Sequence, residues 1–346
     1  MPQPEDYESM SKNSIDETLR LNSPFVGIPS FLRSPICEDL ERLDADIAIM
    51  GAPTDEGSPF LAGSRFGPRA IRENSLRFVF PTPGFYDPET DRVLLEHEMT
   101  NRLIADCGDA DIWPTDVVRT FDNITAMMHG LLDKGVLPVV LGGDHAITYP
   151  VVRAYTEPLH VVHFDAHIDY APFIHDLRFT NSHAFRHIRP MEHVESLIQV
   201  GIRSLRSVES HIKDAVSDGN QVVTMRQYHN EGGPRAIAER VPNGARCYVS
   251  IDVDVLDLSL VPGCVSAEPN GMTYAELRDT LAALAQRTDI VGFDFVEVNP
   301  QLDVGTGLTS YLAAHAVVEF MGNICAQPRW IERREARARE RNRRAG

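Results

Sequence analysis

Short apolar runs alternate with amphipathic stretches along most of the chain, from about residue 44 onward. Several runs are flanked by glycine or aspartate and each is about as long as one strand, a pattern typical of strands buried on both faces of a sheet. We expect strands at residues 46–50, 137–141, 159–164, 197–202, 247–251 and 290–296. The pattern therefore predicts a sheet whose strands are largely shielded from water.

The segments between these runs carry apolar residues at helical spacing. Residues 115–134 form the longest such segment, with Thr115 as the candidate N-cap and Gly135 as the stop signal. Thr273 and Glu276 form a capping-box signature before a leucine-rich stretch. Because strands and helices alternate, we predict an α/β fold, in which a mainly parallel central sheet lies between two layers of helices.

The chain shows no internal repeat, and no linker rich in proline, glycine or serine divides residues 45–325. We therefore expect residues 25–325 to form a single domain, with residues 1–24 as an N-terminal surface extension. Residues 326–346 form an arginine-rich C-terminal tail, whose charges at i,i+4 predict a solvated helix. Two interpretations of this tail stay open: an arm that docks on an acidic neighbouring subunit, or a charged terminus that frays.

The composition restricts the class of partner. The 346 residues include 50 acidic and 33 basic side chains, for a net charge of −17, which disfavours nucleic acid and suits cations. The five scattered cysteines, an odd number, are typical of reduced thiols in a cytoplasmic protein. No apolar run is long enough for a membrane span and no secretory signal is visible, so we expect a cytoplasmic protein.

Metal-type ligands gather directly after three of the expected strands. They are His145 after residues 137–141, Asp165, His167 and Asp169 after residues 159–164, and Asp252 and Asp254 after residues 247–251. Alternate side chains of an extended chain share a face, and the carboxyl ends of parallel strands meet at one edge of the sheet. We therefore expect these six side chains to converge in one crevice.

Carboxylates that converge in this way repel one another unless cations lie between them. Oxygen ligands with one histidine per ion suit Mn²⁺ or Ni²⁺, and no cysteine set of the kind that holds structural zinc is present. The alternative is that each aspartate only caps a turn or a helix after its strand. Because the pattern recurs after three strands, it favours a site for two divalent ions.

The amino-acid sequences of these three motifs are specific. GGDHAIT (142–148), HFDAHID (163–169) and SIDVDVLD (250–257) resemble the three signatures of the ureohydrolase family, which includes arginases and agmatinases. The stretches at 51–75 and 292–303 also resemble that family. The resemblance implies an arginase-like fold and a hydrolase that releases urea from a guanidino compound.

The same resemblance implies roles for individual residues. His145, Asp165, Asp169 and Asp252 would hold one ion, and His167, Asp165, Asp252 and Asp254 the other, with Asp165 and Asp252 bridging. The ions would activate a water molecule for attack on the guanidinium carbon. Glu297 matches the glutamate that binds the guanidinium, and His183 matches the proton-shuttling histidine, a role in which His175 and His187 are nearby competitors. Family members assemble as trimers or hexamers, so a homo-oligomer is expected.

The chain departs from the family pattern around the expected pocket. In segment 262–271 Glu268 is kept, but Cys264 stands in a portion where agmatinases have small residues. Ala171 stands where arginases use an asparagine to bind an amino acid carboxylate, which disfavours a substrate with an α-carboxylate. Tyr170, Cys264 and Glu268 are therefore candidate substrate contacts.

An insertion after the second metal motif brings four aromatic residues, Tyr170, Phe173, Phe179 and Phe185. An aromatic pocket wall would suit a small or alkylated guanidinium cation, unless these rings only pack the loop. The candidate substrates are agmatine, guanidine, and alkylguanidines or biguanides. Two other functions stay open: a non-catalytic partner subunit of an active paralogue, and an amide hydrolase on a related fold.

Overall fold

Within residues 23–78 and 83–345, which the computed structural model describes, eight parallel strands form one sheet in the order β4-β1-β5-β10-β9-β6-β7-β8. The strands are β1 (Ile47–Ala52), β4 (Ile104–Asp109), β5 (Leu137–Gly142), β6 (Leu159–Phe164), β7 (Val194–Ile202), β8 (Gln221–Thr224), β9 (Arg246–Asp252) and β10 (Asp289–Val296). Parallel neighbours need crossover connections, most of which contain helices here. The N-terminal extension predicted over 1–24 lies outside the described residues as far as residue 22.

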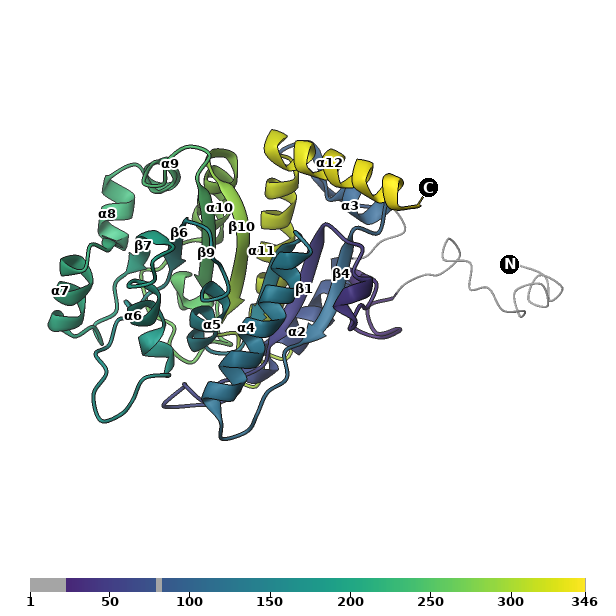
Figure 1. The fold of residues 1–346 in the computed structure, drawn as a ribbon. Coiled ribbons are helices and arrows are strands. Elements are labelled where there is room, and N and C mark those ends of the chain that lie inside the picture. The colour runs from purple at the N-terminus through teal and green to yellow at the C-terminus, as the bar shows by residue number, and fades with distance from the viewer. Residues whose placement is uncertain (1–22, 79–82, 346) are drawn as a thin grey trace.

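Helices cover both faces of the sheet, as Figure 1 shows. They are α2 (Gly67–Ser75), α3 (Glu96–Thr100), α4 (Val117–Asp133), α5 (Thr148–Val152), α6 (Ala184–Ile188), α7 (Glu209–Ser217), α8 (Met225–Asn230), α9 (Gly233–Glu239), α10 (Tyr274–Arg287), α11 (Leu308–Cys325) and α12 (Pro328–Ala345). Short 3-10 helices occupy Phe31–Arg33, Leu40–Arg42, Ser64–Phe66, Leu76–Phe78, His145–Ile147, Asn181–His183 and Val253–Val255. A hairpin of β2 (Phe85–Asp87) and β3 (Arg92–Leu94) stands apart from the main sheet.

Alternate residues of each strand face opposite helix layers. In β1, Ile47 and Ile49 belong to one buried cluster, whereas Ala48 and Met50 belong to the other. The first cluster continues into α2, α8, α9, α10 and α11, and the second into α4, α5, α6 and α7. The predicted three-layer α/β/α arrangement is therefore confirmed.

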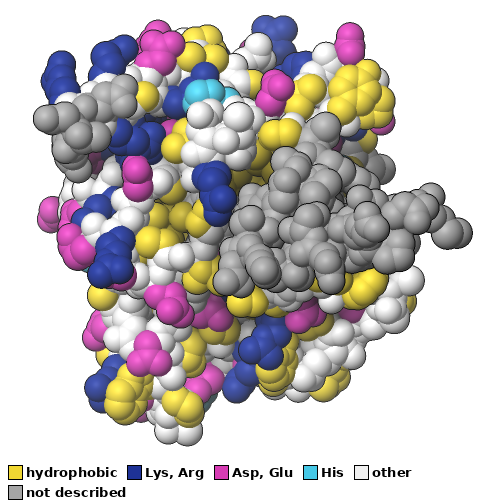
Figure 2. Space-filling model, turned by 90° about the vertical axis from the view of Figure 1, so that its right-hand side faces the viewer, with side chains coloured by type: hydrophobic (Ala, Val, Ile, Leu, Met, Phe, Trp, Pro, Cys, Tyr) yellow, Lys and Arg dark blue, Asp and Glu magenta, His cyan; other side chains and the backbone are white. Residues whose placement is uncertain are grey.

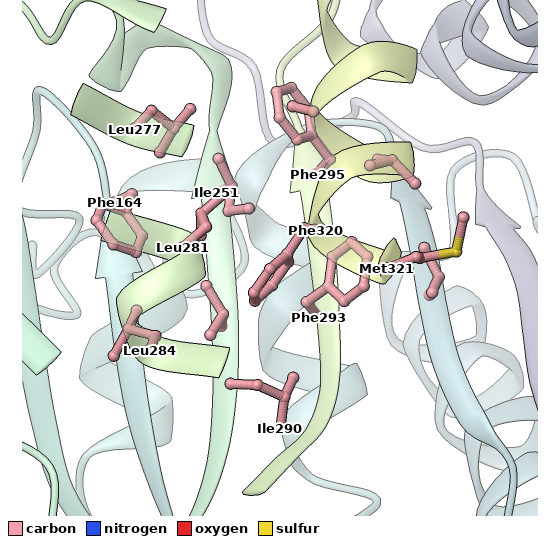
Figure 3. Close-up of a cluster of buried hydrophobic side chains, with 14 of the residues drawn as sticks. Phe164, Ile251, Leu277, Leu281, Leu284, Ile290, Phe293, Phe295, Phe320 and Met321 are labelled. Atoms are coloured by element: carbon pink, nitrogen blue, oxygen red, sulfur yellow. The ribbon is translucent and has the colours of Figure 1, made fainter. Parts of the chain in front are cut away.

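Figure 3 shows part of the first cluster, where leucines of α10 lie over the central strands. The rings of Phe293 in β10 and Phe320 in α11 pack with their centroids 4.8 Å apart. Both rings are buried, and burying a side chain of this size stabilises a fold by roughly 1.5–3 kcal/mol. This packing fixes the strands whose carboxyl ends carry the site.

All six predicted strands are present in the main sheet, and its other two strands, β4 and β8, were not predicted, nor was the hairpin of β2 and β3. In β4, Asp106, Gly108 and Asp109 interrupt the apolar residues, and β8 is a four-residue edge strand. Both are too short or too polar to stand out as apolar runs.

The predicted helix boundaries are close to the observed ones. α4 ends just before Gly135, which has the positive φ of 66° that suits glycine. Its N-cap is Asp116, whose side chain accepts a hydrogen bond from the backbone N–H of Arg119, and not Thr115 as predicted. Both arms of the capping box between Thr273 and Glu276 are formed at the start of α10.

The arginine-rich tail forms helix α12, which lies at the end of the sheet where the strands begin (Figure 1). Arg337 donates hydrogen bonds to the carbonyl oxygens of Ala45, just before β1, and of Lys134, shortly before β5, at 2.7 and 3.0 Å. Arg333 pairs with Asp289, the first residue of β10, at 2.5 Å. These arginines therefore bind acidic and carbonyl groups of their own chain.

Three further observations concern the cysteines, membrane-spanning segments and the distribution of surface charge. All five cysteines are free thiols. No helix in the described part of the chain combines the length and apolar character needed to cross a bilayer. Acidic and basic side chains are interspersed on the face drawn in Figure 2.

Four neighbouring strands in the middle of the sheet, β5, β10, β9 and β6, end at the same edge. The chain leaves these strands at Gly143, Glu297, Val253 and Asp165. Residues just after the four strand ends are therefore brought close together although they are far apart in the sequence.

Candidate functional site

The first group of ligands surrounds the imidazole of His145, which follows β5. Its Nδ1 atom lies 3.0 Å from Oδ2 of Asp165, 3.3 Å from Oδ2 of Asp169 and 3.1 Å from Oδ2 of Asp252. His145 is fully buried, and its Nε2 atom lies 2.9 Å from the hydroxyl of Ser250. One nitrogen thus faces three carboxylates while the other is held by a strand residue.

The second group surrounds His167. Its Nδ1 atom lies 3.2 Å from Oδ1 of Asp165 and 3.0 Å from Oδ2 of Asp254. Asp252 lies beside this group, because its side chain accepts a hydrogen bond from the backbone N–H of Asp254 at 2.8 Å. Asp165 therefore presents a different oxygen to each histidine, as a bridging carboxylate requires.

The charges in this cluster are unbalanced without added cations. Burial and the neighbouring carboxylates raise the pKa of Asp252 well above its usual range, and they also raise the pKa of Asp169. Burial opposes protonation of His167, but Asp254 and Asp165 outweigh it and raise its pKa to about 12. Shifts in these directions are expected where carboxylates are packed together with no cation between them.

The donor set fits two divalent ions. Four aspartates and two histidines converge in two groups that share Asp165, and each of the four aspartates is at most 9% exposed. Oxygen and imidazole donors in these proportions suit ions such as Mn²⁺ or Ni²⁺. Asp252 also caps the short helix that follows it, so the capping and ligand interpretations hold together for this residue.

Glu297 lies at the carboxyl end of β10, next to the two ligand groups. Its Oε1 atom accepts a hydrogen bond from the backbone N–H of His145 at 3.0 Å, and the Asn181 amide lies 3.5 Å away. Burial raises the pKa of Glu297 to about 7. Glu297 and Asp169 have φ angles of 65° and 43°, a region that costs a residue with a side chain about 1–3 kcal/mol. Such strain is characteristic of functional positions.

A cavity of about 280 Å³ opens directly onto the ligand groups. His167, Asp169, Asp252 and Glu297 line it, and the remaining lining comes from the loops and short helices that follow β1, β6, β7 and β9. Its other lining residues are Ser58, Pro59, Phe60, Ile168, Tyr170, Ala171, Asn181, Ser182, Arg206, Ser207, Val208, His211, Val265 and Ser266. The volume suits a small molecule.

The loop after β1, which carries the first part of the 51–75 motif, is held by a buried aspartate. Asp55 accepts hydrogen bonds from the backbone N–H groups of Gly63 and Arg65, and it also pairs with the Arg65 side chain. At Gly57 a Cβ atom would lie 2.7 Å from Asp144 and 2.9 Å from the backbone of Asn181, so only glycine fits there. This loop is thereby packed against the pocket.

His183 lies behind the pocket wall formed by its neighbours Asn181 and Ser182. It is 4% exposed, its Nδ1 atom lies 2.7 Å from the Thr180 hydroxyl, and its Nε2 atom lies 3.3 Å from the Pro172 carbonyl. Burial lowers the pKa of His183, so the ring is neutral at pH 7. It is not among the residues that line the cavity.

The three residues expected to contact substrate have different surroundings. Tyr170 lies at the cavity, but it is buried and its hydroxyl donates to Asp218 at 2.7 Å. Cys264 lies near Asp252 and Asp254 rather than at the cavity surface. Glu268 accepts hydrogen bonds from Ser204 and Arg206 and lies 3.6 Å from Nε2 of His167.

The aromatic residues of the insertion mostly pack against protein. Phe179 lies against Phe121 and Tyr149, and Phe185 stacks on His163 at 3.7 Å. Of the four, only Tyr170 lines the cavity. The phenylalanines of the insertion are therefore not part of the cavity lining, whose aromatic residues are Tyr170, Phe60 and two histidines.

Four further residues at the site escaped prediction. His163 lies 2.8 Å from Asp165, and Asn181, Arg206 and His211 line the cavity. The spacing of His163 from Asp165 could have identified it, because residues two apart on a strand share a face. Arg206 and His211 come from a loop and from α7 after β7, where no motif marks them.

Comparisons with known proteins agree with this geometry. The model of the Arginase family matches residues 45–322, a range that includes all six ligands and Glu297. The guanidinopropionase of Pseudomonas aeruginosa is 34% identical over 308 residues, covering 86% of this chain and 92% of the relative. The proclavaminate amidinohydrolase of Streptomyces clavuligerus is 33% identical over 310 residues, covering 86% and 93%.

Solved structures give the same result for the fold. The structure of the proclavaminate amidinohydrolase of Streptomyces clavuligerus matches with a TM-score of 0.76 and 29% identity, over 87% of this chain and 98% of that one. A hypothetical agmatinase from Burkholderia thailandensis matches with a TM-score of 0.74 and 26% identity, over 87% and 92%. Both matches cover nearly the whole of the related chain.

Proposed function

Because the chain belongs to the arginase family of amidinohydrolases, which cleave C–N bonds of linear amidines, we propose that it hydrolyses a small guanidino compound to urea and an amine with two divalent metal ions. Mn²⁺ or Ni²⁺ is the proposed cofactor. The overall reaction adds one water to R–NH–C(NH₂)₂⁺ and yields R–NH₃⁺ and urea. Where R is hydrogen, the second product is ammonium.

One observation carries this proposal: two histidine-centred carboxylate groups and a buried glutamate meet at one small cavity. His145, Asp165, Asp169 and Asp252 would hold one ion, and His167, Asp165, Asp252 and Asp254 the other. When bound, two such ions supply a water of lowered pKa, the nucleophile that a resonance-stabilised guanidinium needs. The third element, a carboxylate for the substrate cation, is Glu297.

Glu297 would bind and orient the guanidinium. A carboxylate and a guanidinium form charge-assisted hydrogen bonds that fix both position and plane. The backbone N–H of His145 holds Oε1 of Glu297 in place and Asn181 lies at the same oxygen, so the side chain is set before substrate arrives. The planar carbon would then face the ligand groups.

The leaving nitrogen needs a proton, and we assign its delivery to Nε2 of His183, which would first take up a proton because its ring is neutral at pH 7. The hydrogen bond of this atom to the Pro172 carbonyl is 3.3 Å, long enough to be exchanged readily for a substrate nitrogen. His211 is the alternative proton donor, because it lines the cavity and His183 does not.

Agmatine, guanidine and alkylated guanidines or biguanides are the proposed cationic substrates. A guanidino acid without an α-amino group is a second candidate, and Arg206 favours it because its guanidinium lies at the cavity and is partly exposed. Relatives named guanidinopropionase and proclavaminate amidinohydrolase support the same class. The acidic floor would take the guanidinium and the basic rim the carboxylate.

The test is to incubate the full chain, loaded with Mn²⁺ or Ni²⁺, with agmatine, guanidine, metformin, 3-guanidinopropionate, 4-guanidinobutyrate and arginine, and to measure urea. We expect urea from at least one of the first five and little from arginine. Absence of urea from every compound with protein that holds its metal would contradict the proposed function. We also propose a homo-oligomer, which light scattering of the same sample would test.

A further inference from the structure

His163 lies directly beneath the metal-type ligands, on β6 and two residues before Asp165. It is fully buried, and its Nε2 atom lies 2.8 Å from Oδ2 of Asp165. The same oxygen lies 3.0 Å from Nδ1 of His145. His163 therefore contacts the ligand oxygen that belongs to the first group without standing in the substrate pocket.

The direction of the hydrogen bonds around His163 is fixed by a carbonyl group. The amide nitrogen of Gln199 lies 2.7 Å from the backbone carbonyl of Ile168, which can only accept, and its amide oxygen accepts from Asn220 at 2.8 Å. The Gln199 amide is thus oriented with its NH₂ toward His163. That NH₂ lies 3.0 Å from Nδ1 of His163, so this ring nitrogen accepts.

A neutral imidazole carries one N–H, and an accepting Nδ1 atom places it on Nε2. The Nε2–H group of His163 then donates to Oδ2 of Asp165. His163 is close enough to His145 and Asp165 to be counted with them as a candidate ligand, but the proton on Nε2 excludes metal binding by that atom. The hydrogen bonds run from Asn220, just before β8, through Gln199 in β7 and His163 in β6 to Asp165.

The ring itself has little freedom to rotate. Phe185 stacks on it with centroids 3.7 Å apart and an interplanar angle of 20°, and the His145 ring packs against its edge at 4.8 Å. A donor held in this way restricts the Asp165 carboxylate to one orientation. In that orientation Oδ2 faces His145 and Oδ1 lies 3.2 Å from Nδ1 of His167.

We propose that His163 is a positioning residue for the bridging carboxylate of Asp165, with its tautomer set by Gln199 and Asn220. The inference rests on the proposed function, since it assigns a role toward the two metal ions. The Nε2–H group would keep one oxygen of Asp165 facing each of the two ligand groups. Without it, Asp165 is free to turn both oxygens to one ion, so the pair binds less tightly. Partners of this kind typically contribute roughly 10- to 100-fold to metal affinity.

The test compares Mn²⁺ binding by His163→Leu and His163→Gln, with the full chain stripped of metal and titrated at constant pH. Free Mn²⁺ is measured by its electron paramagnetic resonance signal, so no turnover is needed. We expect His163→Leu to bind roughly 10- to 100-fold more weakly than the wild type. His163→Gln should stay within about 5-fold of the wild type, because its amide NH₂ can reach the position of Nε2.

Two further variants separate this role from a structural one. His160→Leu removes another histidine from β6, one that contacts Ser196 and Glu195 outside the site, and should bind Mn²⁺ like the wild type. Gln199→Leu should weaken Mn²⁺ binding on its own. Combined with His163→Leu it should cause little further loss, because Gln199 acts through the His163 ring. Melting temperatures of the metal-free proteins show which variants fold.

Equal Mn²⁺ affinity of folded His163→Leu and wild type would overturn the inference. Equal losses of Mn²⁺ affinity in His163→Leu and His163→Gln would overturn it as well, because the glutamine can donate a hydrogen bond to Asp165 and the leucine cannot. If His163→Leu does not fold, Gln199→Leu decides by the same criterion. A wild-type chain that binds no Mn²⁺ or Ni²⁺ would instead contradict the proposed function.

Discussion

The backbone N–H of His145 donates a 3.0 Å hydrogen bond to Oε1 of Glu297, across 152 residues of sequence. The bond joins the turn after β5 to the turn after β10, two strands that are neighbours in the sheet. It fixes the carboxylate proposed to hold the guanidinium relative to the first ligand group. This arrangement has a cost in stability, because it buries the carboxyl group of Glu297 close to other carboxylates.

That cost predicts how Glu297 affects stability in the metal-free protein. Burial raises its pKa to about 7 from an ordinary value of 4.5, so the folded state holds this proton more tightly than the unfolded state. The contribution of Glu297 to stability therefore falls as the pH rises from about 4.5 to about 7. Glu297→Gln does not titrate, so its melting temperature relative to the wild type should rise by roughly 2–4 °C between pH 5 and pH 8. A difference that stays constant over this range would contradict the assigned pKa.

Arg206 is expected to select among substrates by charge. It lies at the cavity, where its Nε donates to Glu268 at 3.0 Å and its Nη2 donates to the carbonyl of Ser266 at 2.8 Å. Arg206→Gln should raise KM for 3-guanidinopropionate by about 5- to 20-fold, as loss of one charge-assisted contact predicts. KM for agmatine serves as the internal control and should stay the same or fall. Equal changes in KM for both compounds would mean that Arg206 only holds its loop in place and does not select substrates by charge.

The two candidate proton donors, His183 and His211, can be separated kinetically. His183→Asn should lower kcat by about 100-fold while bound metal and KM change little, because a proton donor acts in the transition state. His211→Asn alters only a residue of the cavity lining, so its main effect should be on KM. The reverse ranking would give the proton-donor role to His211.

Helix α12 should stabilise the fold without affecting the reaction. Arg337 reaches Asp46 at 2.7 Å as well as the carbonyls of Ala45 and Lys134, and the Asp46 side chain is 1% exposed. Arg337→Ala should therefore lower the free energy of unfolding by about 1–3 kcal/mol with unchanged kcat. Arg339 is the matched control: its side chain is 65% exposed and lies 3.8 Å from Glu335. If both substitutions lower the free energy of unfolding by the same amount in urea denaturation, the docking of α12 is not what stabilises the chain.

The ligand set was predictable from the sequence because it follows strands that are themselves visible as apolar runs. Parallel strands end at one edge, which brings the residues that follow them together. The assumption of an extended chain through Asp165, His167 and Asp169 was wrong, because β6 ends at Phe164 and Asp169 has a φ of 43°. Glu297 required the resemblance of its surroundings, since a glutamate after a strand carries no signal of its own. The structure brings it to within hydrogen-bonding distance of His145.

What escaped prediction depends on contacts between distant segments. His163 was counted as one more residue of a buried run, and only its bonds to Gln199 and Asp165 distinguish it. Thr115 and Asp116 are both good N-cap residues, and the choice between them depends on the backbone of the preceding loop. The tail arginines pair with acidic and carbonyl groups before β1 and β5 and at the first residue of β10, which no local pattern could indicate.

The central claim is that two ions and Glu297 act together on a guanidino compound. It is tested most directly by titrating Mn²⁺ or Ni²⁺ into metal-free protein while bound ions per chain and urea release are measured on the same samples, with Glu297→Gln as the matched control. We expect binding to saturate at about two ions per chain, urea release to rise with the second ion, and Glu297→Gln to bind both ions but release at least about 100-fold less urea. Saturation at one ion or fewer, or equal urea release by the wild type and Glu297→Gln, would contradict the account.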